Sequence, residues 1–202
     1  MQDGREKMKK IIVGISGASG VIYGIRLLEV LRDLPEIETH LVMSNAASIT
    51  IALETDYTPD SVQALADVQY RFKDIAARIA SGSFKTDGMV VLPCSMKTLA
   101  GIANSFSDNL LLRAADVVLK DRRRLVLVPR ETPLHLGHLR LMTQVTEYGA
   151  ILVPPMPAFY HRPQTIDDIV NQTVNRVLDV LDIELPKDLF TRWQGGNLKN
   201  AT

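Results

Sequence analysis

The sequence contains very little cysteine, since Cys94 is the only one among 202 residues. A single cysteine cannot form an intrachain disulfide, and the Cys and His spacings of structural zinc sites are absent. Residues 1–10 lack the apolar stretch of a signal peptide, and no later apolar run reaches the length of a membrane span. We therefore expect a cytoplasmic protein without a membrane segment.

The sequence also lacks a net charge, because 23 Lys and Arg residues balance 23 Asp and Glu residues. Without an overall positive field, neither nucleic acid nor an anionic membrane is an expected partner. The only clustered charge is the run KDRRR at residues 120–124. We interpret this run as a solvated turn at the end of a helix, where cations offset the helix dipole. Any phosphate must then be held by local contacts.

Two kinds of apolar segment alternate along the chain, and the alternation predicts the fold class. Short strand-like runs cover residues 10–15, 39–43, 89–92, 125–128 and 151–153. Helical patterns follow at residues 21–34, 46–53, 98–103, 110–119, 138–148 and 166–181. Such βαβ units predict an α/β protein with a parallel sheet and helices on both faces. The length of 202 residues favours one domain over residues 1–202, with a frayed leader at 1–8 and a surface tail at 186–202.

Residues 57–84 form the least regular part of the sequence. They contain Pro59, scattered charge and the turn Ser81-Gly82-Ser83. We expect a loop with at most one short strand here, passing over the ligand site.

The glycine-serine loop at residues 14–20 is the most informative segment, because it links the first strand to the first helix. In parallel α/β sheets, ligands bind at this edge. Glycines let the backbone approach an anion, Ser16 and Ser19 add hydroxyl donors, and the helix N-terminus presents unpaired amides. The loop predicts a phosphate site, while a tight turn that needs glycine only for space gives the same pattern.

The same loop excludes several nucleotide-binding classes. Gly14, Gly17 and Gly20 do not have the G-x-G-x-x-G spacing, and the second strand ends at Ser44 without an acidic residue. A dinucleotide is therefore disfavoured. The chain also lacks the P-loop and G-x-S-x-G motifs, which removes the P-loop ATPases and the serine hydrolases.

Several charged residues have two interpretations from the sequence alone. Arg113 and Lys120 are seven residues apart with Asp116 between them, so they share one helix face. They could bind a second anion, or they could form an exposed salt-bridge ladder. Glu54 and Glu131 are candidate proton carriers, and each could equally be a surface or capping residue.

Short motifs occur along the chain in a defined order. They are GISGASG at 14–20, YG at 23–24, ETD at 54–56, SGSF at 81–84, PCS at 93–95, RAAD at 113–116, VPRETP at 128–133, FYH at 159–161 and RW at 192–193. In this order they resemble the UbiX-type flavin prenyltransferases, formerly called aromatic-acid decarboxylases. The resemblance runs from about residue 8 to residue 193 and is more specific than any single motif.

The resemblance implies a flavodoxin-like, Rossmann-like domain of three αβα layers that binds FMN and dimethylallyl phosphate. Its reaction would join the dimethylallyl group to N5 and C6 of reduced FMN, and the prenylated flavin would serve a UbiD-type decarboxylase. It further implies a homo-oligomer, specifically a dodecamer with sites at subunit interfaces. No metal is expected, because Asp167-Asp168 is not followed by the rest of the DDxxD motif of magnesium-dependent prenyltransferases.

The resemblance also assigns site residues by their positions in the motifs. The implied flavin-binding residues are Gly17, Ala18, Ser19, Ser44, Ser95, Met96, Lys97, Thr98 and Arg130. The implied prenyl-phosphate contacts are Arg113, Lys120, Tyr160 and Arg176, together with Glu54. The implied catalytic residues are Ser19, Glu54 and Glu131, of which Ser19 and Glu131 would carry the proton transfers. Cations and a phenol suit this role, because they stabilise the phosphate as the allylic C–O bond breaks.

Two alternatives stay open at this point. Flavin-dependent decarboxylases of the cysteine-decarboxylase type share the scaffold, but their PxMNxxMW motif is replaced here by PRETPL at residues 129–134. A flavin-binding module without its own chemistry would not explain why the prenyl-phosphate residues are all in place. The chain also departs from related sequences at Ile75, where they can have a tryptophan that shields the prenyl group.

Overall fold

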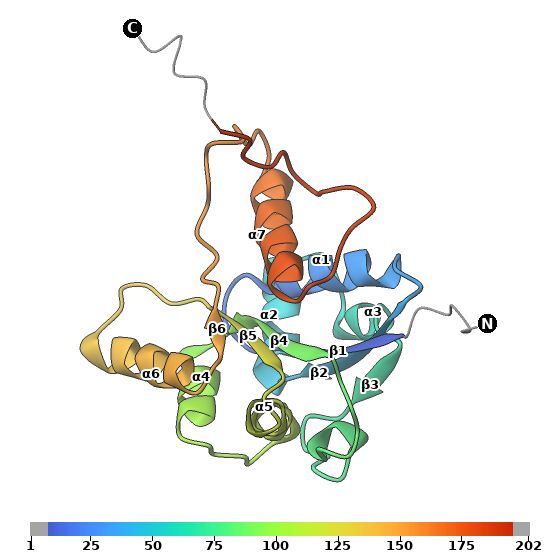
Figure 1. Ribbon diagram of the computed structural model, residues 1–202, viewed down its shortest axis with the longest axis vertical. Coiled ribbons are helices and arrows are strands. Elements are labelled where there is room, and N and C mark those ends of the chain that lie inside the picture. Colours follow the sequence, from blue (N-terminus) through green and yellow to red (C-terminus); the bar gives the residue numbers. More distant parts are fainter. Residues whose placement is uncertain (1–7, 196–202) are drawn as a thin grey trace, which may run out of the picture.

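The computed structural model describes residues 8–195 (Figure 1). Residues 1–7 of the expected leader at 1–8 and residues 196–202 of the expected tail lie outside the described residues. The strands are β1 (Lys9–Ile15), β2 (Ile37–Met43), β3 (Val68–Tyr70), β4 (Gly88–Cys94), β5 (Arg124–Pro129) and β6 (Ile151–Leu152). They form a six-stranded sheet in the order β3-β2-β1-β4-β5-β6, and every neighbouring pair is parallel. The predicted α/β class with a parallel sheet is confirmed.

Helices cover both faces of this sheet. They are α1 (Val21–Arg32), α2 (Asn45–Glu54), α3 (Pro59–Gln63), α4 (Met96–Ala103), α5 (Leu110–Lys120), α6 (Leu136–Glu147) and α7 (Ile166–Val180), with a 3₁₀ turn η1 (Arg78–Ala80). Ile11 and Val13 of β1 pack with α1 and α7, whereas Ile12 packs with α4 and α5. This alternation arises because successive side chains of a strand point to opposite faces. Figure 1 shows α1 and α7 above the sheet and α5 below it.

The segment 57–84 is more ordered than we expected. The expected short strand is present as β3, but the segment also contains α3 and η1. α3 begins with a capping box between Thr58 and Ser61 and has Pro59 in its first turn. Proline is well tolerated there, because the first amides of a helix have no partner within it. Interpreting Pro59 as a mark of irregular structure was therefore wrong.

The order of the strands defines where a ligand can bind. From β1 the chain proceeds outward to β2 and β3, then returns to β4 beside β1 and proceeds outward to β5 and β6. The sheet therefore has its topological switch point between the carboxyl ends of β1 and β4, which is the usual ligand crevice of open α/β sheets. The glycine-serine loop follows β1, and Ser95 follows β4, so both border this crevice.

No helix within residues 8–195 combines the length and the apolar character that crossing a membrane requires.

Candidate functional site

The glycine-serine loop after β1 has the geometry of an anion site. α1 begins after Gly20, which has a left-handed φ of 96° and supplies no side-chain cap to the helix. At Gly17 the backbone lies so close to α2 that an added Cβ would be 2.2 Å from the Cβ of Ala46. Glycine is therefore required at both positions, by conformation at Gly20 and by space at Gly17. The N-terminus of α1 points toward the crevice, as a phosphate site requires.

Ser16 has a different role from the one that we expected. Its hydroxyl is buried, donates to the Pro93 carbonyl at 2.9 Å and accepts the Ser95 amide at 2.7 Å. A hydroxyl has only one proton to donate, so Ser16 cannot also donate to a ligand. The expectation of a donor at Ser16 was wrong, and its side chain instead joins the turn after β1 to the turn after β4.

Ser44 and Ser95 are the N-caps of α2 and α4, which begin at the carboxyl edge of the sheet, called here the rim. The Ser44 hydroxyl accepts the Ala47 amide at 3.0 Å, and the Ser95 hydroxyl accepts the Thr98 amide at 3.3 Å. Met96, Lys97 and Thr98 form the first turn of α4. α1, α2 and α4 thus all begin at the same edge of the sheet, and each N-terminus contributes a partial positive charge. The rim favours an anionic ligand even though the chain has no net charge.

Arg130 and Glu131 follow β5 and lie on the same rim. The Arg130 amide donates to the Cys94 carbonyl at 3.2 Å, which fixes this turn beside the end of β4. The Arg130 side chain lies near Tyr23 of α1, where burial raises the pKa of the phenol and the guanidinium charge partly offsets this rise. Glu131 is exposed and accepts the amide of Thr132 at 3.0 Å.

Glu54 lies at the junction of α1 and α2. One of its carboxylate oxygens accepts the Gly20 amide at 2.8 Å. The end of α2 is thereby joined to the start of α1, where the helix dipole favours a negative charge. The sequence suggested a proton carrier or capping residue at Glu54 but gave no signal for this partner, since the two residues are 34 positions apart.

Arg113 and Lys120 flank the turn at residues 81–83 from α5. The Nε atom of Arg113 donates to the Ala80 carbonyl at 3.1 Å, and a Cβ added at Gly82 would lie 2.9 Å from Nζ of Lys120. The salt-bridge ladder that we considered exists in part: Arg113 pairs with Asp116 at 2.8 Å, but Lys120 pairs with Asp121 at 3.1 Å. The two cations therefore lie beside the same turn, with part of their charge already balanced.

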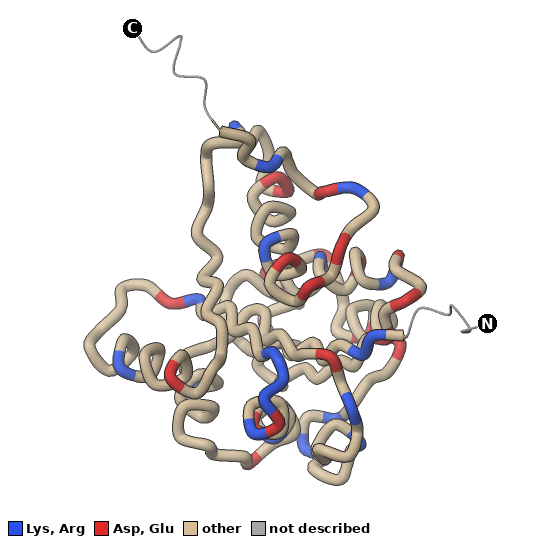
Figure 2. Tube along the Cα trace, viewed as in Figure 1, with Lys and Arg blue, Asp and Glu red and all other residues tan. Residues whose placement is uncertain are grey.

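Arg123 is a structural residue that the sequence interpretation missed. Figure 2 shows the basic run directly after α5, but the Arg123 side chain is only 11% exposed. It donates to the carbonyls of Gly82 at 2.8 Å and Phe84 at 3.0 Å and pairs with Asp121 at 2.5 Å. The solvated-turn interpretation was wrong for this residue, because the planar guanidinium fits several acceptors of the adjacent turn at once. Arg123 thereby holds that turn against Lys120.

Tyr160 and Arg176 lie in another layer of the fold. Tyr160 follows β6 and is 46% exposed, and Arg176 lies on α7 with a 62% exposed side chain, 3.8 Å from Asp179. α7 covers one face of the sheet and α5 covers the other. Arg113 and Lys120 of α5 therefore lie on the face of the sheet opposite to Arg176 of α7. This separation within one chain is compatible with the expectation that the sites lie at subunit interfaces.

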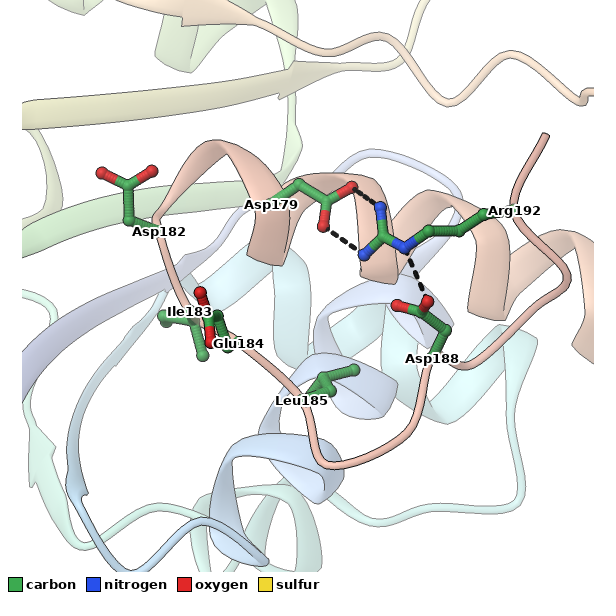
Figure 3. Close-up of a pocket in the computed structure, with 7 residues that line it drawn as sticks. All are labelled: Asp179, Asp182, Ile183, Glu184, Leu185, Asp188 and Arg192. Carbon is green, nitrogen blue, oxygen red and sulfur yellow. Dashed lines mark hydrogen bonds and ion pairs between the residues drawn. The ribbon is translucent and has the colours of Figure 1, made fainter. Parts of the chain in front are cut away.

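A surface cavity of about 570 Å³ lies far from the rim (Figure 3). Its lining residues are Asp179, Asp182, Ile183, Glu184, Leu185, Asp188 and Arg192. Asp182 is bound to Lys9 and to Arg124, which are the first residues of β1 and β5. The cavity therefore adjoins the amino ends of the strands, opposite the ligand crevice. Its predominantly acidic lining does not suit a phosphate.

Residues 8–195 contain no group of three or more His, Cys, Asp or Glu side chains that could hold a metal ion. Cys94, at the end of β4, is fully buried, and this burial raises the pKa of its thiol far above the ordinary value. The thiolate is the reactive form of cysteine, so Cys94 is not a candidate nucleophile.

We expect Cys94 in the folded protein to resist alkylation by iodoacetamide at pH 8, because both burial and the raised pKa suppress the thiolate. Mass spectrometry of intact protein should show no adduct until denaturant is added, and then one adduct per chain. Rapid labelling of the native protein would show that the end of β4 opens readily.

Comparisons with known proteins show the family of this chain. A family model described as Flavoprotein matches residues 2–178. The flavin prenyltransferase UbiX of Escherichia coli K12 is 70% identical over 188 residues, covering 93% of this chain and 100% of that protein. The chain belongs to the UbiX flavin prenyltransferases. The resemblance read from the motifs is confirmed, and the cysteine-decarboxylase alternative is set aside.

Two solved UbiX structures share the whole fold with this family member. A dodecameric FMN-dependent UbiX-like decarboxylase from Escherichia coli O157:H7 is 56% identical with a TM-score of 0.89, covering 92% of this chain and 100% of its own. A UbiX protein in complex with FMN and dimethylallyl pyrophosphate is 51% identical with a TM-score of 0.90, covering 95% of this chain and 100% of its own. The expected flavodoxin-like fold with three αβα layers is thus confirmed, and it is shared with these two UbiX structures.

Proposed function

We propose that this chain transfers the dimethylallyl group of dimethylallyl phosphate to N5 and C6 of reduced FMN. The observation that carries the proposal is the rim at the switch point, where a glycine loop and three helix N-termini meet in a member of the UbiX family. The allylic C–O bond breaks and the phosphate leaves with the electron pair. Protons leave N5 and C6 of the flavin as the two new bonds form, and one proton is delivered to the alkene.

The rim supplies the groups that FMN needs. Gly17, Ala18 and Ser19 would surround its phosphate at the start of α1, where amides and the helix dipole favour an anion. Ser44 at the start of α2, the turn of Ser95, Met96, Lys97 and Thr98 at the start of α4, and Arg130 after β5 would contact the rest of the nucleotide. The close packing of Gly17 on Ala46 brings the loop directly beside the start of α2, so the two helix N-termini can act on the same ligand.

Proton transfer is assigned to side chains on the same rim. Ser19 lies in the loop after β1, and Glu131 is an exposed carboxylate after β5, so both lie at the edge of the sheet where the ligand would bind. Glu54 would help to position the prenyl phosphate while its carboxylate accepts the Gly20 amide.

The prenyl phosphate would be held by residues of two subunits. Arg113 and Lys120 lie on one face of the sheet, and Tyr160 and Arg176 on the other, so a second copy is needed to complete the ring. Large exposed apolar side chains offer surfaces for such copies, among them Leu53 of α2 at 80% and Phe159 at 71% exposure. The dodecameric assembly of the Escherichia coli O157:H7 relative supports a homododecamer.

The partner and the location follow from the proposed product. Prenylated FMN is made for another enzyme, and we propose a UbiD-type decarboxylase as the recipient, as the family resemblance implies. The cytoplasm is the proposed location, in line with the single cysteine of the chain.

The decisive experiment incubates the purified protein anaerobically with reduced FMN and dimethylallyl phosphate. We expect mass spectrometry of the extracted flavin to show one added prenyl unit, with inorganic phosphate released in equal amount. Bound flavin of unchanged mass would identify the chain as a flavin-binding module without its own chemistry. Reactions that lack either substrate provide the control.

A further inference from the structure

The last described part of the chain, residues 183–195, lies against α7 and is called here the C-terminal strap. Its backbone is attached where the Leu189 amide donates to the side chain of Asn175 at 2.8 Å. A second attachment is the guanidinium of Arg192, which lies between Asp179 and Asp188 (Figure 3). It donates to both oxygens of Asp179, at 2.9 and 2.7 Å, and to Asp188 at 2.6 Å. Such a bidentate arginine–carboxylate contact is among the strong polar interactions of proteins.

The first consequence concerns Arg176, one of the proposed phosphate contacts. Its Nη1 atom lies 3.8 Å from Oδ2 of Asp179, too far for a hydrogen bond. Because Arg192 occupies both oxygens of Asp179, this carboxylate has less capacity to draw Arg176 into a close ion pair. The Arg176 side chain therefore keeps its 62% exposure and its charge for an anion.

The second consequence concerns Tyr160, the phenol of the proposed site. The C-terminal strap brings Phe190 and Trp193 against Tyr160, edge to face, with ring centroids 6.4 and 5.7 Å away. Phe190 also packs on His161 at 5.5 Å. Aromatic pairs in this geometry are favourable, so the strap restricts the Tyr160 ring. Figure 1 shows the segment after β6 and the strap meeting near the same end of α7.

We infer that Arg192 is a positioning residue, which fixes the C-terminal strap so that Tyr160 and Arg176 together present a formed site to the prenyl phosphate. The inference rests on the proposed function, since it assumes that these two side chains bind the phosphate. Arg192 itself is engaged by two carboxylates and need not touch the substrate. The hydrogen bond from Arg192 also holds the pKa of Asp188 below the usual value.

Arg192→Ala should raise the KM for dimethylallyl phosphate by about tenfold, the effect of losing one good polar contact, while the Kd for FMN changes by less than about twofold. Arg192→Lys keeps the charge without the bidentate fork, so an intermediate KM is expected. Adding Asp179→Asn to Arg192→Ala should recover part of the KM, because it removes the carboxylate that competes for Arg176. A purely structural role for Arg192 would not produce this recovery.

A second measurement reports the mobility of the C-terminal strap directly. Trp193 is the only tryptophan of the chain, so its fluorescence anisotropy decay reports the motion of the strap without any label. Arg192→Ala should add a fast component to this decay, and Arg192→Lys should add a smaller one. The matched control is Arg124→Ala, which removes a comparable arginine–aspartate pair with Asp182 at the other end of the cavity. It should change neither the KM nor the tryptophan decay.

The inference is overturned if Arg192→Ala leaves both the KM and the Trp193 decay unchanged, or if the KM rises equally in Arg124→Ala. If Arg192→Ala does not fold, Arg192→Lys decides by the same two criteria. Failure of the proposed function is distinguishable, since wild-type protein would then yield no prenylated flavin, while the Trp193 decay would still test the attachment of the strap.

Discussion

Glu131→Gln is expected to abolish the formation of prenylated flavin while FMN still binds. The amide has nearly the shape of the carboxylate but cannot accept or deliver a proton in the same way. General acid–base catalysis contributes about 10²–10⁴-fold, so kcat should fall by that factor. The measurement is single-turnover kinetics under anaerobic conditions, with the Kd for FMN determined on the same preparation.

The placement of Glu131 makes this test interpretable. Its carboxylate is exposed on the rim and accepts only the adjacent amide of Thr132, so the substitution should not disturb the fold. Glu147→Gln, at the exposed end of α6, serves as the matched control and should keep wild-type turnover. Wild-type turnover in Glu131→Gln would remove this residue from the mechanism.

Gly17→Ala is expected to eliminate FMN binding and to destabilise the protein. The added methyl group would lie 2.2 Å from the Cβ of Ala46 and 3.0 Å from its carbonyl carbon, so the loop must move away from α2. Overpacking of this kind costs about 1–3 kcal/mol, and we expect the upper end because backbone atoms are among the contacts. Thermal unfolding and flavin fluorescence titration measure the two effects.

Two further variants separate crowding from a general loss of glycine. Gly14→Ala adds the same methyl group in β1, where the nearest atom is 3.3 Å away in the flexible Leu111 side chain, so a smaller effect is expected. Adding Ala46→Gly to Gly17→Ala removes the closest contact and should restore part of the stability and of the FMN affinity. Tight FMN binding by Gly17→Ala alone would show that the loop does not hold the phosphate.

The sequence predicted the fold largely because the two periodicities differ so clearly along this chain. β1 and β4 are short runs of branched residues that both end before polar turns, and α1 carries a regular apolar stripe. The secondary structure of the segment 57–84 was harder to predict, because α3 and β3 are too short to show a periodic pattern of apolar residues. The capping residue Thr58 and the proline after it were the usable signal there.

The site was predictable only to the level of the local loops. Gly17, Ser44, Ser95 and Arg130 follow strands, and parallel strands bring such positions to one rim. Contacts between distant segments gave no sequence signal, as with Glu54 on the Gly20 amide and Arg123 on the Gly82 carbonyl. The division of the proposed phosphate contacts between two faces follows from which helices pack on which side of the sheet, and no local pattern encodes it.

The two hydrogen bonds of Ser16 have a consequence for the thermodynamics of flavin uptake. They hold the turns after β1 and β4 in one arrangement. The glycine-serine loop is therefore preorganised in the folded chain before any nucleotide binds. The conformational entropy of these turns is lost during folding, which leaves little to be lost when the ligand enters. Affinity for the flavin is therefore expected to depend on a serine whose only hydroxyl proton is already donated within the protein.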